Sequence, residues 1–285
     1  MKILVTGSEG QLGRALRPML DAAHEVIWGD LPDLDVRNWA DLRNLVRGQR
    51  PNLILHLAAL TDVDVCEQNI EQAFAVNALG TRAVAIAARE VAARLFFVST
   101  DYVFDGSSRD PYQEYDTPGP LNCYGRSKLH GERAVRELAP EHCIVRTSGL
   151  FGPGGRNFAK SIWEAQARQQ PLRVVADQTC RPTFAGDLAV ALGALIEGGH
   201  VGTFHVASRG AVRWSEFARA VVQASGGEGA DVVEISSTEL RRPAPRPAYS
   251  VLATRAYEIL TGRELPHWRE GLAAYVRELR AGAGS

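Results

Sequence analysis

A tyrosine precedes a lysine by four residues in the segment NCYGRSKLHGE, and this pair could carry out acid–base chemistry. Tyr124 and Lys128 share one face if the segment is helical, because residues four apart are neighbours on a helix surface. A phenol has a pKa of about 10 and exchanges protons poorly near neutrality, whereas a nearby ammonium group stabilises the phenolate and lowers its pKa. The chain has only three lysines among its 285 residues. A lysine at this position therefore indicates a need for a compact positive charge. Its ammonium group can also donate a hydrogen bond to a hydroxyl group of a ligand.

A hydroxyl side chain is expected beside this pair, at the end of a buried strand. Ser99 and Thr100 close the segment RLFFVST (94–100), and either hydroxyl could donate a hydrogen bond to a carbonyl oxygen on which negative charge develops. Together with Tyr124 and Lys128, such a hydroxyl predicts proton transfer to a carbonyl group. A surface helix with an exposed tyrosine is the alternative interpretation.

Three glycines lie three residues apart in TGSEGQLG, between a predicted strand and a predicted helix. Gly7 permits a tight turn, Gly10 allows the backbone to approach a pyrophosphate, and Gly13 allows the helix to pack closely on the strand. The N-terminus of the helix would then face the anion. The spacing differs from the G-x-G-x-x-G of many dehydrogenases, and a plain turn is the alternative. Because the loop follows the first strand, where open α/β sheets bind ligands, we predict a dinucleotide site.

An acidic residue at the end of the second predicted strand bears on the choice of dinucleotide. Asp30 could accept a hydrogen bond from the adenosine ribose, and its carboxylate would repel a 2′-phosphate, which favours NAD. Arg37 is close enough in sequence to keep NADP open, and an ordinary loop or capping role is the alternative for Asp30. After the third strand, the small residues of LAALTDVD (57–64) would let the backbone pass close to a dinucleotide or, equally, let a helix pack.

Short apolar runs alternate with helix-like segments along the first half of the chain. Strands without polar alternation, joined by helices, indicate βαβ units and a parallel sheet. We therefore predict an α/β fold, a Rossmann-type doubly wound parallel sheet with a smaller α/β substrate-binding lobe. The strands are predicted at 2–7, 24–30, 52–59, 94–100 and 142–148, and the helices at 10–20, 39–48, 69–91 and 124–138.

The regular alternation loosens after residue 149, where a glycine-rich loop begins. We predict a dinucleotide-binding domain over residues 1–148, which also receives strands from about 172–208 and 230–255. Residues 149–285 form mainly a substrate-binding lobe that is interleaved with this domain. Helices in the second part are predicted at 157–169, 214–225 and 268–280.

Composition and charge narrow the classes of protein. The net charge is −1, with 45% hydrophobic and 23% charged residues, so no strong field favours nucleic acid or a membrane surface. No apolar run approaches the ~18 residues of a membrane span, and the N-terminus does not resemble a signal peptide. The four cysteines form no C-x-x-C pair, which indicates reduced thiols and a cytoplasmic location. No histidines, cysteines or carboxylates have metal-ligand spacing, so no metal site is predicted.

Several motifs together resemble those of the extended short-chain dehydrogenase/reductases, and most of all the dTDP-4-dehydrorhamnose reductase family. They follow one another over nearly the whole chain: TGSEGQLG, HLAALTDVD, STDYVFDG, LNCYGRSKLHGE, IVRTSGLFG, NFAK, RPT and RPAYSVL. Members of that family reduce the C4 ketone of dTDP-4-dehydrorhamnose to form dTDP-L-rhamnose, with NADPH or NADH. The resemblance implies an oxidoreductase with this activity, a nucleotide-sugar substrate and a role in dTDP-rhamnose biosynthesis.

The resemblance also implies roles for individual residues. The catalytic hydroxyl, acid and lysine would be Thr100, Tyr124 and Lys128, and substrate contacts would come from Thr100, Asp101 and Tyr102. The cofactor contacts implied by the family are combined here with the outer glycines of the turn and the Tyr–Lys pair. The full predicted set is Gly7, Gly10, Gln11, Leu12, Gly13, Asp30, Asp35, Val36, Ala58, Ala59, Thr61, Tyr124 and Lys128.

The substrate's diphosphate needs cationic partners, and the second half of the chain offers arginines rather than lysines for this purpose. Arg246 lies in the proline-rich connection RRPAPRPAYS (241–250), where extended family members often place a diphosphate ligand. Arg181 follows a predicted strand and is expected to open towards the cleft between the lobes. Asn157 is assigned to the substrate as well. Ordinary surface arginines are the alternative interpretation of both arginines.

Two positions depart from the family pattern. Many members carry a tryptophan after the Arg-Thr-Ser of the fifth strand, where this chain has Gly149, and often a small residue before Pro-Thr, where it has Arg181. Both changes would alter the side chains that surround the sugar in family members. The exact sugar and base, the preference between NADH and NADPH, and a homodimer therefore stay open.

Two other functions fit the same motifs. A sugar-nucleotide epimerase of the same superfamily would share Tyr124 and Lys128, and it would retain its cofactor tightly. A non-catalytic NADP-binding subunit resembling the regulatory subunit of methionine adenosyltransferase is the second alternative. Related dehydratases carry a glutamate at the position of Tyr102, so this chain lacks the acid that they use to protonate a leaving hydroxyl.

Overall fold

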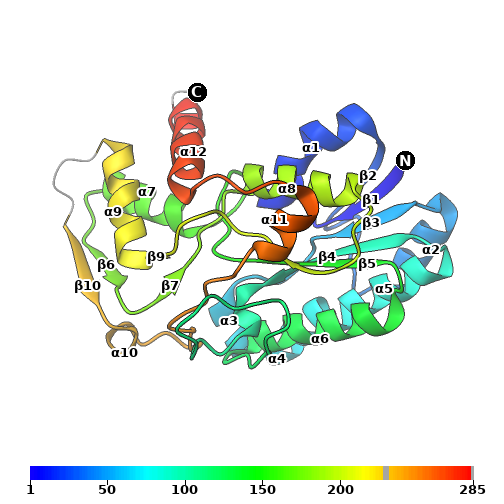
Figure 1. Cartoon of the computed structure of the whole chain (residues 1–285), viewed down its shortest axis with the longest axis horizontal. Helices are drawn as coiled ribbons and strands as arrows, with labels where there is room; N and C mark the ends of the chain where they lie inside the picture. The colour runs from blue at the N-terminus through cyan, green and yellow to red at the C-terminus, as the bar shows by residue number, and fades with distance from the viewer. Residues whose placement is uncertain (227–230, 284–285) are drawn as a thin grey trace.

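A six-stranded parallel sheet forms the centre of the larger lobe (Figure 1). The computed structural model describes residues 1–226 and 231–283 of the chain. The order of the strands reverses between β1 and β3, so a crevice opens at the carboxyl ends of these two strands, where sheets of this kind bind ligands. Across the sheet the strands are β2 (Glu25–Gly29), β1 (Lys2–Thr6), β3 (Leu53–His56), β4 (Arg94–Thr100), β5 (His142–Thr147) and β8 (Gly202–His205).

Helices cover both faces of this sheet, which confirms the predicted α/β fold. One face carries α1 (Gln11–Ala23), α8 (Ala185–Glu197) and α11 (Arg255–Thr261), and the other carries α2 (Trp39–Gln49), α5 (Thr81–Glu90) and α6 (Cys123–Leu138) (Figure 1). The side chains of β3 divide between the two layers. Leu53 and Leu55 pack in the core with α1 and α8, and Ile54 packs with α2 and α5. A strand buried on both faces must be apolar throughout, which is why these runs could be predicted.

The long helix predicted over 69–91 includes a π-helical segment in the structure. After α3 (Val63–Gln68) come α4 (Ile70–Phe74), a π-helical segment (Ala75–Gly80) and α5. Buried Asn77 lies in the π-helical segment, where its side-chain amide bonds to both backbone groups of Leu60 and donates to the Ser127 hydroxyl. The helix predicted over 69–91 is therefore present, since the chain is helical without a break from Ile70 to Glu90. Its π-helical segment was not predicted, because hydrophobic periodicity does not reveal a turn widened around a buried polar side chain.

A second lobe with its own core lies beside the main sheet (Figure 1). Its core is rich in aromatic side chains, among them Phe151, Phe217 and Tyr275. It contains two small sheets, in which β6 (Leu172–Val175) pairs with β10 (Val232–Ile235), and β7 (Thr179–Cys180) pairs with β9 (Val212–Arg213). Its helices are α7 (Phe158–Ala167), α9 (Trp214–Ser225), α10 (Ser237–Leu240) and α12 (Trp268–Ala283).

The later strands only partly join the main sheet as predicted. From 172–208, β8 pairs with β5 at the sheet edge, whereas β6 pairs with β10 in the second lobe. The expectation that 230–255 adds a strand to the main sheet was therefore wrong. Residues Val233 and Glu234 in β10 are exposed, and α9 contacts both strands of this small sheet. An apolar run predicts a strand, but it does not show which sheet the strand joins.

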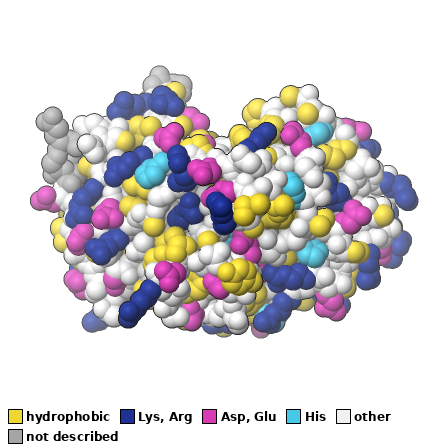
Figure 2. Space-filling model, in the orientation of Figure 1, with side chains coloured by type: hydrophobic (Ala, Val, Ile, Leu, Met, Phe, Trp, Pro, Cys, Tyr) yellow, Lys and Arg dark blue, Asp and Glu magenta, His cyan; other side chains and the backbone are white. Residues whose placement is uncertain are grey.

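The surface carries both signs of charge. Basic and acidic side chains are interspersed on the face in Figure 2, and a notch in the outline lies between α12 and α1 (Figures 1 and 2). Across residues 1–226 and 231–283, no helix has the length and apolar character needed to cross a membrane. Within the same ranges, no three His, Cys, Asp or Glu residues are grouped to hold a metal ion. The four cysteines are free and buried.

Candidate active site

A cavity of about 900 Å³ opens at the carboxyl ends of the strands of the main sheet. Every residue predicted to contact the cofactor lines this cavity, from Gly7 in the first loop to Lys128 on α6. Thr100, Asp101 and Tyr102, which follow β4, line it as well. The structure therefore brings together the predicted dinucleotide site and the predicted catalytic residues in one continuous space.

The loop between β1 and α1 has the geometry of a phosphate-binding turn. Gly7 has φ +73°, and a Cβ at this position would lie 2.5 Å from the backbone nitrogen of Ala58. A residue with a side chain would thus be strained and would also clash. At Gly10 the helix α1 begins, and no side chain among the described residues caps its first turn. The N–H groups of that turn are left for an anion, so the chain fits a dinucleotide at this point.

Two aspartates lie where the adenosine end of a dinucleotide would bind. Asp30 accepts a hydrogen bond from the backbone N–H of Glu9 at 2.6 Å and another from Leu31 at 2.8 Å, so it also orders the phosphate-binding turn. Asp35 is paired with Arg37, whose Nε lies 2.9 Å from the carboxylate. The hydrogen bond from the Arg37 guanidinium lowers the pKa of Asp35. Because Arg37 also lines the cavity, both a carboxylate and a guanidinium face the ribose region.

The start of α6 places Tyr124 and Lys128 in the cavity. Asn122 caps the helix by accepting from the N–H of Gly125 at 2.8 Å, and the Tyr124 ring contacts the edge of Tyr102 at 6.2 Å between centroids. Lys128 is buried, with its Nζ 4.1 Å from the centroid of Phe97. The predicted spacing of four residues therefore does put both functional groups on one helical face.

Burial dominates the electrostatics of this pair. It raises the pKa of Tyr124 well above its usual value, and a hydrogen bond involving Thr100 only partly opposes this. It also lowers the pKa of Lys128 to about 7. The expectation that Lys128 brings the phenol pKa down was wrong for this structure, because desolvation destabilises the phenolate more than the surrounding groups stabilise it. Tyr124 is therefore a neutral phenol, which is the form that donates a proton.

The two hydroxyls that close β4 have different partners. Ser99 donates to the buried carboxylate of Glu132 at 2.6 Å, and Arg146 holds the same carboxylate through two bonds of 2.9 and 2.8 Å. The Ser99 hydroxyl is thus engaged in the core. Thr100 donates to Asp101 at 3.0 Å and accepts from the Tyr102 N–H at 3.1 Å. Both residues line the cavity, but the Ser99 hydroxyl is bound to a buried carboxylate that Arg146 also holds, so Thr100 is the better candidate for the catalytic hydroxyl.

Asp101 is a buried acid next to the candidate catalytic hydroxyl. Its second oxygen accepts from the Ser148 hydroxyl at 2.7 Å. Burial raises the pKa of Asp101 to about 6, and the hydrogen bonds from Ser148 and Thr100 act in the opposite direction. The carboxyl group is therefore poised to change protonation close to neutral pH.

Three residues predicted to contact the substrate do not line the cavity. Asn157 caps α7 by accepting from Lys160 N–H at 2.9 Å, and its amide donates to Gln11 at 3.0 Å. The Arg181 guanidinium donates to the backbone carbonyls of Ser208 at 2.7 Å and Leu252 at 2.6 Å. The structure thus does not open Arg181 towards the cleft as predicted, because these backbone carbonyls use its donors.

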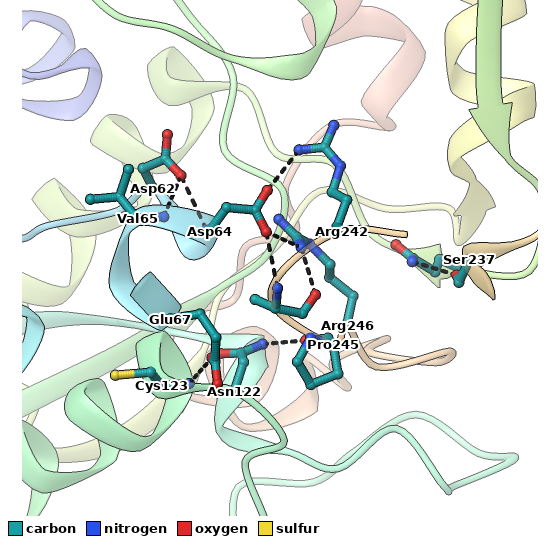
Figure 3. A network of polar contacts seen from close by, with 12 residues as sticks. Asp62, Asp64, Val65, Glu67, Asn122, Cys123, Ser237, Arg242, Pro245 and Arg246 are labelled. Carbon is teal, nitrogen blue, oxygen red and sulfur yellow. Dashed lines mark hydrogen bonds and ion pairs between the residues drawn. The ribbon is translucent and has the colours of Figure 1, made fainter. Parts of the chain in front are cut away.

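Arg246 is engaged in a contact between the two lobes (Figure 3). Its Nη1 lies 2.6 Å from Asp64 on α3 and 2.6 Å from the carbonyl of Ala244. Arg242 approaches the other oxygen of Asp64 at 3.0 Å. Burial raises the pKa of Asp64, but the hydrogen bonds from Arg246, Ala244 and Arg242 outweigh it and lower the pKa to about 2. We call Asp64, Arg242, Ala244 and Arg246 the Asp64 clamp.

Several residues that line the cavity were absent from the predicted site set, and two of them, Arg156 and Trp214, bear on ligand binding. Arg156 ends the glycine-rich loop after β5, and Gly155 in that loop lies against the side chain of Gln11. The loop's composition was a signal for Arg156 that could have been used. Trp214 reaches the cavity from the second lobe, and no local motif indicates this placement.

The RmlD substrate binding domain family matches residues 1–281. The chain is 38% identical over 279 residues to the Bacillus subtilis spore coat polysaccharide biosynthesis protein SpsK, with 97% of both chains covered. It is 38% identical over 288 residues to dTDP-4-dehydrorhamnose reductase of Streptomyces griseus, covering 99% of this chain and 95% of the relative.

The chain is also similar to a third relative and to a solved structure. The chain is 36% identical over 271 residues to dTDP-4-keto-6-deoxy-D-glucose reductase of Streptomyces niveus, with 94% of both chains covered. The crystal structure of dTDP-4-dehydrorhamnose reductase from Bacillus anthracis in complex with NADP superimposes with a TM-score of 0.94 at 36% identity, covering 97% of this chain and 99% of that one. The chain therefore belongs to the RmlD substrate binding domain family, as its motifs predicted, and is a dTDP-4-dehydrorhamnose reductase-like oxidoreductase.

Proposed function

We propose that the protein reduces the C4 ketone of a dTDP-4-dehydro-6-deoxyhexose with NADPH or NADH, and that its substrate is dTDP-4-dehydrorhamnose, which becomes dTDP-L-rhamnose. The observation that carries this proposal is the single cavity shared by the phosphate-binding turn and the Thr100, Tyr124 and Lys128 side chains. The names of the Streptomyces griseus and Bacillus anthracis relatives support the same substrate. The reaction would belong to carbohydrate biosynthesis in the cytoplasm, where four free cysteines are stable.

A dinucleotide would be held by the cavity residues before β4. The N-terminus of α1 would bind its pyrophosphate, and Asp30 would accept from the adenosine ribose. Arg156 would add a positive charge beside Gln11, since both line the same space. When bound, the cofactor supplies a hydride to the sugar carbon.

The chain's own residues would then manage the proton. Tyr124 would donate its phenolic proton to the C4 oxygen, because its high pKa keeps it protonated until negative charge develops on that oxygen. Lys128 would offset the phenolate that remains, and its ammonium could also donate to a ribose hydroxyl. Thr100 would need to turn its proton from Asp101 to the substrate oxygen in order to share that charge.

The substrate's sugar would lie against Thr100, Asp101 and Tyr102, which line the cavity beyond the cofactor end. Arg246, Arg181 and Asn157 would contribute only if substrate binding altered their present contacts. A second candidate substrate is dTDP-4-keto-6-deoxy-D-glucose, which differs from dTDP-4-dehydrorhamnose in configuration at C3 and C5 and which the name of the Streptomyces niveus relative favours.

The proposal is tested by following NADPH and NADH oxidation with a panel of nucleotide 4-keto sugars that vary in base and in configuration. We expect oxidation with dTDP-4-dehydrorhamnose and release of dTDP-L-rhamnose. Turnover of only dTDP-4-keto-6-deoxy-D-glucose would assign the second substrate. Reversible change at C4 with a cofactor that is not consumed would instead show an epimerase, and no turnover together with capture of methionine adenosyltransferase would show a regulatory subunit.

A further inference from the structure

Trp214 brings the second lobe into contact with the cavity. Among the described residues that follow Arg156, it alone lines the cavity. It is the first residue of α9, and its backbone N–H donates to the Gln178 carbonyl at 3.3 Å. Thr100, Asp101 and Tyr124 line the same cavity. The indole therefore forms part of the wall of the space that holds the proposed catalytic groups.

Aromatic packing fixes the orientation of this indole. The Trp214 ring lies 4.6 Å from the ring of Phe158 and 6.0 Å from that of Phe217, measured between centroids. Both partners belong to the core of the second lobe. A side chain that is half-buried between such neighbours keeps one rotamer, so its free face is presented to the cavity without a large entropic cost on binding.

Gly149 leaves room for the indole. This glycine follows β5 and has φ +53°, and a Cβ there would lie 3.3 Å from Cη2 of Trp214 and 3.1 Å from Cα of Pro182. A larger side chain at 149 would therefore have to displace the indole. At this point the cavity wall is therefore formed by the Trp214 side chain from the second lobe, which lies against the backbone of Gly149.

We propose that Trp214 is a specificity residue that packs its indole face against the hexose, and so selects nucleotides that carry a 6-deoxyhexose. This inference rests on the proposed function. One side of a 6-deoxyhexose presents ring C–H groups and the C6 methyl, and a flat apolar ring is complementary to such a surface. Gly149, which lies against the indole, comes two residues after Thr147, and Thr147 pairs with Thr100 where β5 and β4 end.

The test measures binding rather than turnover. Titration calorimetry of the full chain with NADP present would compare dTDP-L-rhamnose with dTDP, which lacks the hexose. For Trp214→Ala we expect the Kd of dTDP-L-rhamnose to rise about tenfold and that of dTDP to stay within about twofold of wild type. Trp214→Phe keeps an aromatic face and should lose no more than about threefold. Trp214→Leu serves the same comparison if the alanine variant does not fold.

Trp163→Ala is the matched control, because this half-buried tryptophan packs against the same core but does not line the cavity. It should leave both Kd values near those of wild type. Equal weakening of both compounds by Trp214→Ala, an equal effect of Trp163→Ala, or unchanged binding of dTDP-L-rhamnose would each overturn the inference. If the wild type still reduces 4-keto sugars in those cases, the proposed function holds and only the role of Trp214 is wrong. A wild-type chain that binds neither compound overturns both.

Discussion

The neutral phenol of Tyr124 is the feature on which the proposed chemistry depends. Tyr124→Phe removes the acidic proton and keeps the ring, so kcat should fall by a factor of roughly 10²–10⁴, the usual worth of general acid catalysis. The KM for NADPH should hardly change. Steady-state kinetics with the best keto sugar would measure this, and Tyr115→Phe at an exposed position provides the matched control. Turnover near the wild-type rate would remove Tyr124 from the mechanism.

Asp30 is expected to discriminate between the two dinucleotides. Asp30→Ala removes an acceptor for the ribose 2′-hydroxyl and also a charge that repels a 2′-phosphate, so the KM for NADH should rise about tenfold relative to that for NADPH. Loss of the bond to Glu9 would disturb the turn for both cofactors equally, so the ratio of the two KM values is the informative quantity. Asp33→Ala removes the same charge from an exposed position outside the cavity and serves as the control. An unchanged ratio would show that Asp30 does not read this part of the cofactor.

The sequence predicted the cavity residues where they belong to local motifs. Gly10 and Gln11 lie where the phosphate-binding turn meets α1, and the glycine spacing of this turn is typical of dinucleotide binding. Tyr124 and Lys128 are neighbours on one helix. Trp214 could not be predicted, because it reaches the cavity only through the packing of the second lobe. Arg181 was misplaced for the converse reason. The residues next to Arg181 in the sequence predicted a cation near the cleft. They could not reveal that backbone carbonyls of Ser208 and Leu252 accept hydrogen bonds from its guanidinium.

At the scale of elements, the Asp64 clamp fastens the connection 241–250 to α3 (Figure 3). Asp64 is 19% exposed and Arg246 12% exposed, so the pair is shielded from water more than a surface ion pair. Asp64→Asn should lower the free energy of unfolding by about 1–2 kcal/mol, as measured by urea denaturation at neutral pH. Glu239→Gln breaks a pair whose partners are both more than half exposed, and it should cost less than about 0.5 kcal/mol.

The contribution of the Asp64 clamp to stability should depend on pH. The folded pKa of Asp64, about 2, lies below the ordinary value of 3.8. The clamp's contribution is therefore fully present above the unfolded pKa and is lost as the pH falls towards 2. The stability difference between wild type and Asp64→Asn should thus be constant from neutrality down to about pH 5 and shrink below it. A difference that stays constant down to about pH 2.5 would contradict this account.

Elements could be predicted where burial makes the sequence uniform. Each of the strands β1 to β5 contains a short apolar run, and each was expected within a few residues of its observed position. The helix over 69–91 was predicted without its π-helical segment, in which Asn77 bonds to Leu60 and Ser127. β10 was assigned to the wrong sheet, since strand pairing depends on neighbours that are distant in the sequence.

At the scale of the whole molecule, burying Lys128 costs stability that depends on pH. Its folded pKa of about 7 lies below the ordinary 10.5, so the folded state binds fewer protons between these values and the cost falls as the pH rises through this window. Lys128→Met should therefore increase the free energy of unfolding more at about pH 6 than at about pH 9.5, by roughly 1–3 kcal/mol. Thermal or urea unfolding at both pH values measures this. Lys160→Met, at a half-exposed site, should show no such difference.

The path of the chain between the lobes has a consequence for how such a protein can change. After β5 the chain builds α7, β6 and β7 of the second lobe, returns for α8 and β8 of the main sheet, and then forms β9, α9 and β10. It returns once more as α11 before α12 ends it in the second lobe (Figure 1). No single cut in the gene separates the two parts. Exchange of the C-terminal half between relatives by recombination would replace β8, α8 and α11 together with the second lobe, so the incoming half must also fit the sheet of the recipient.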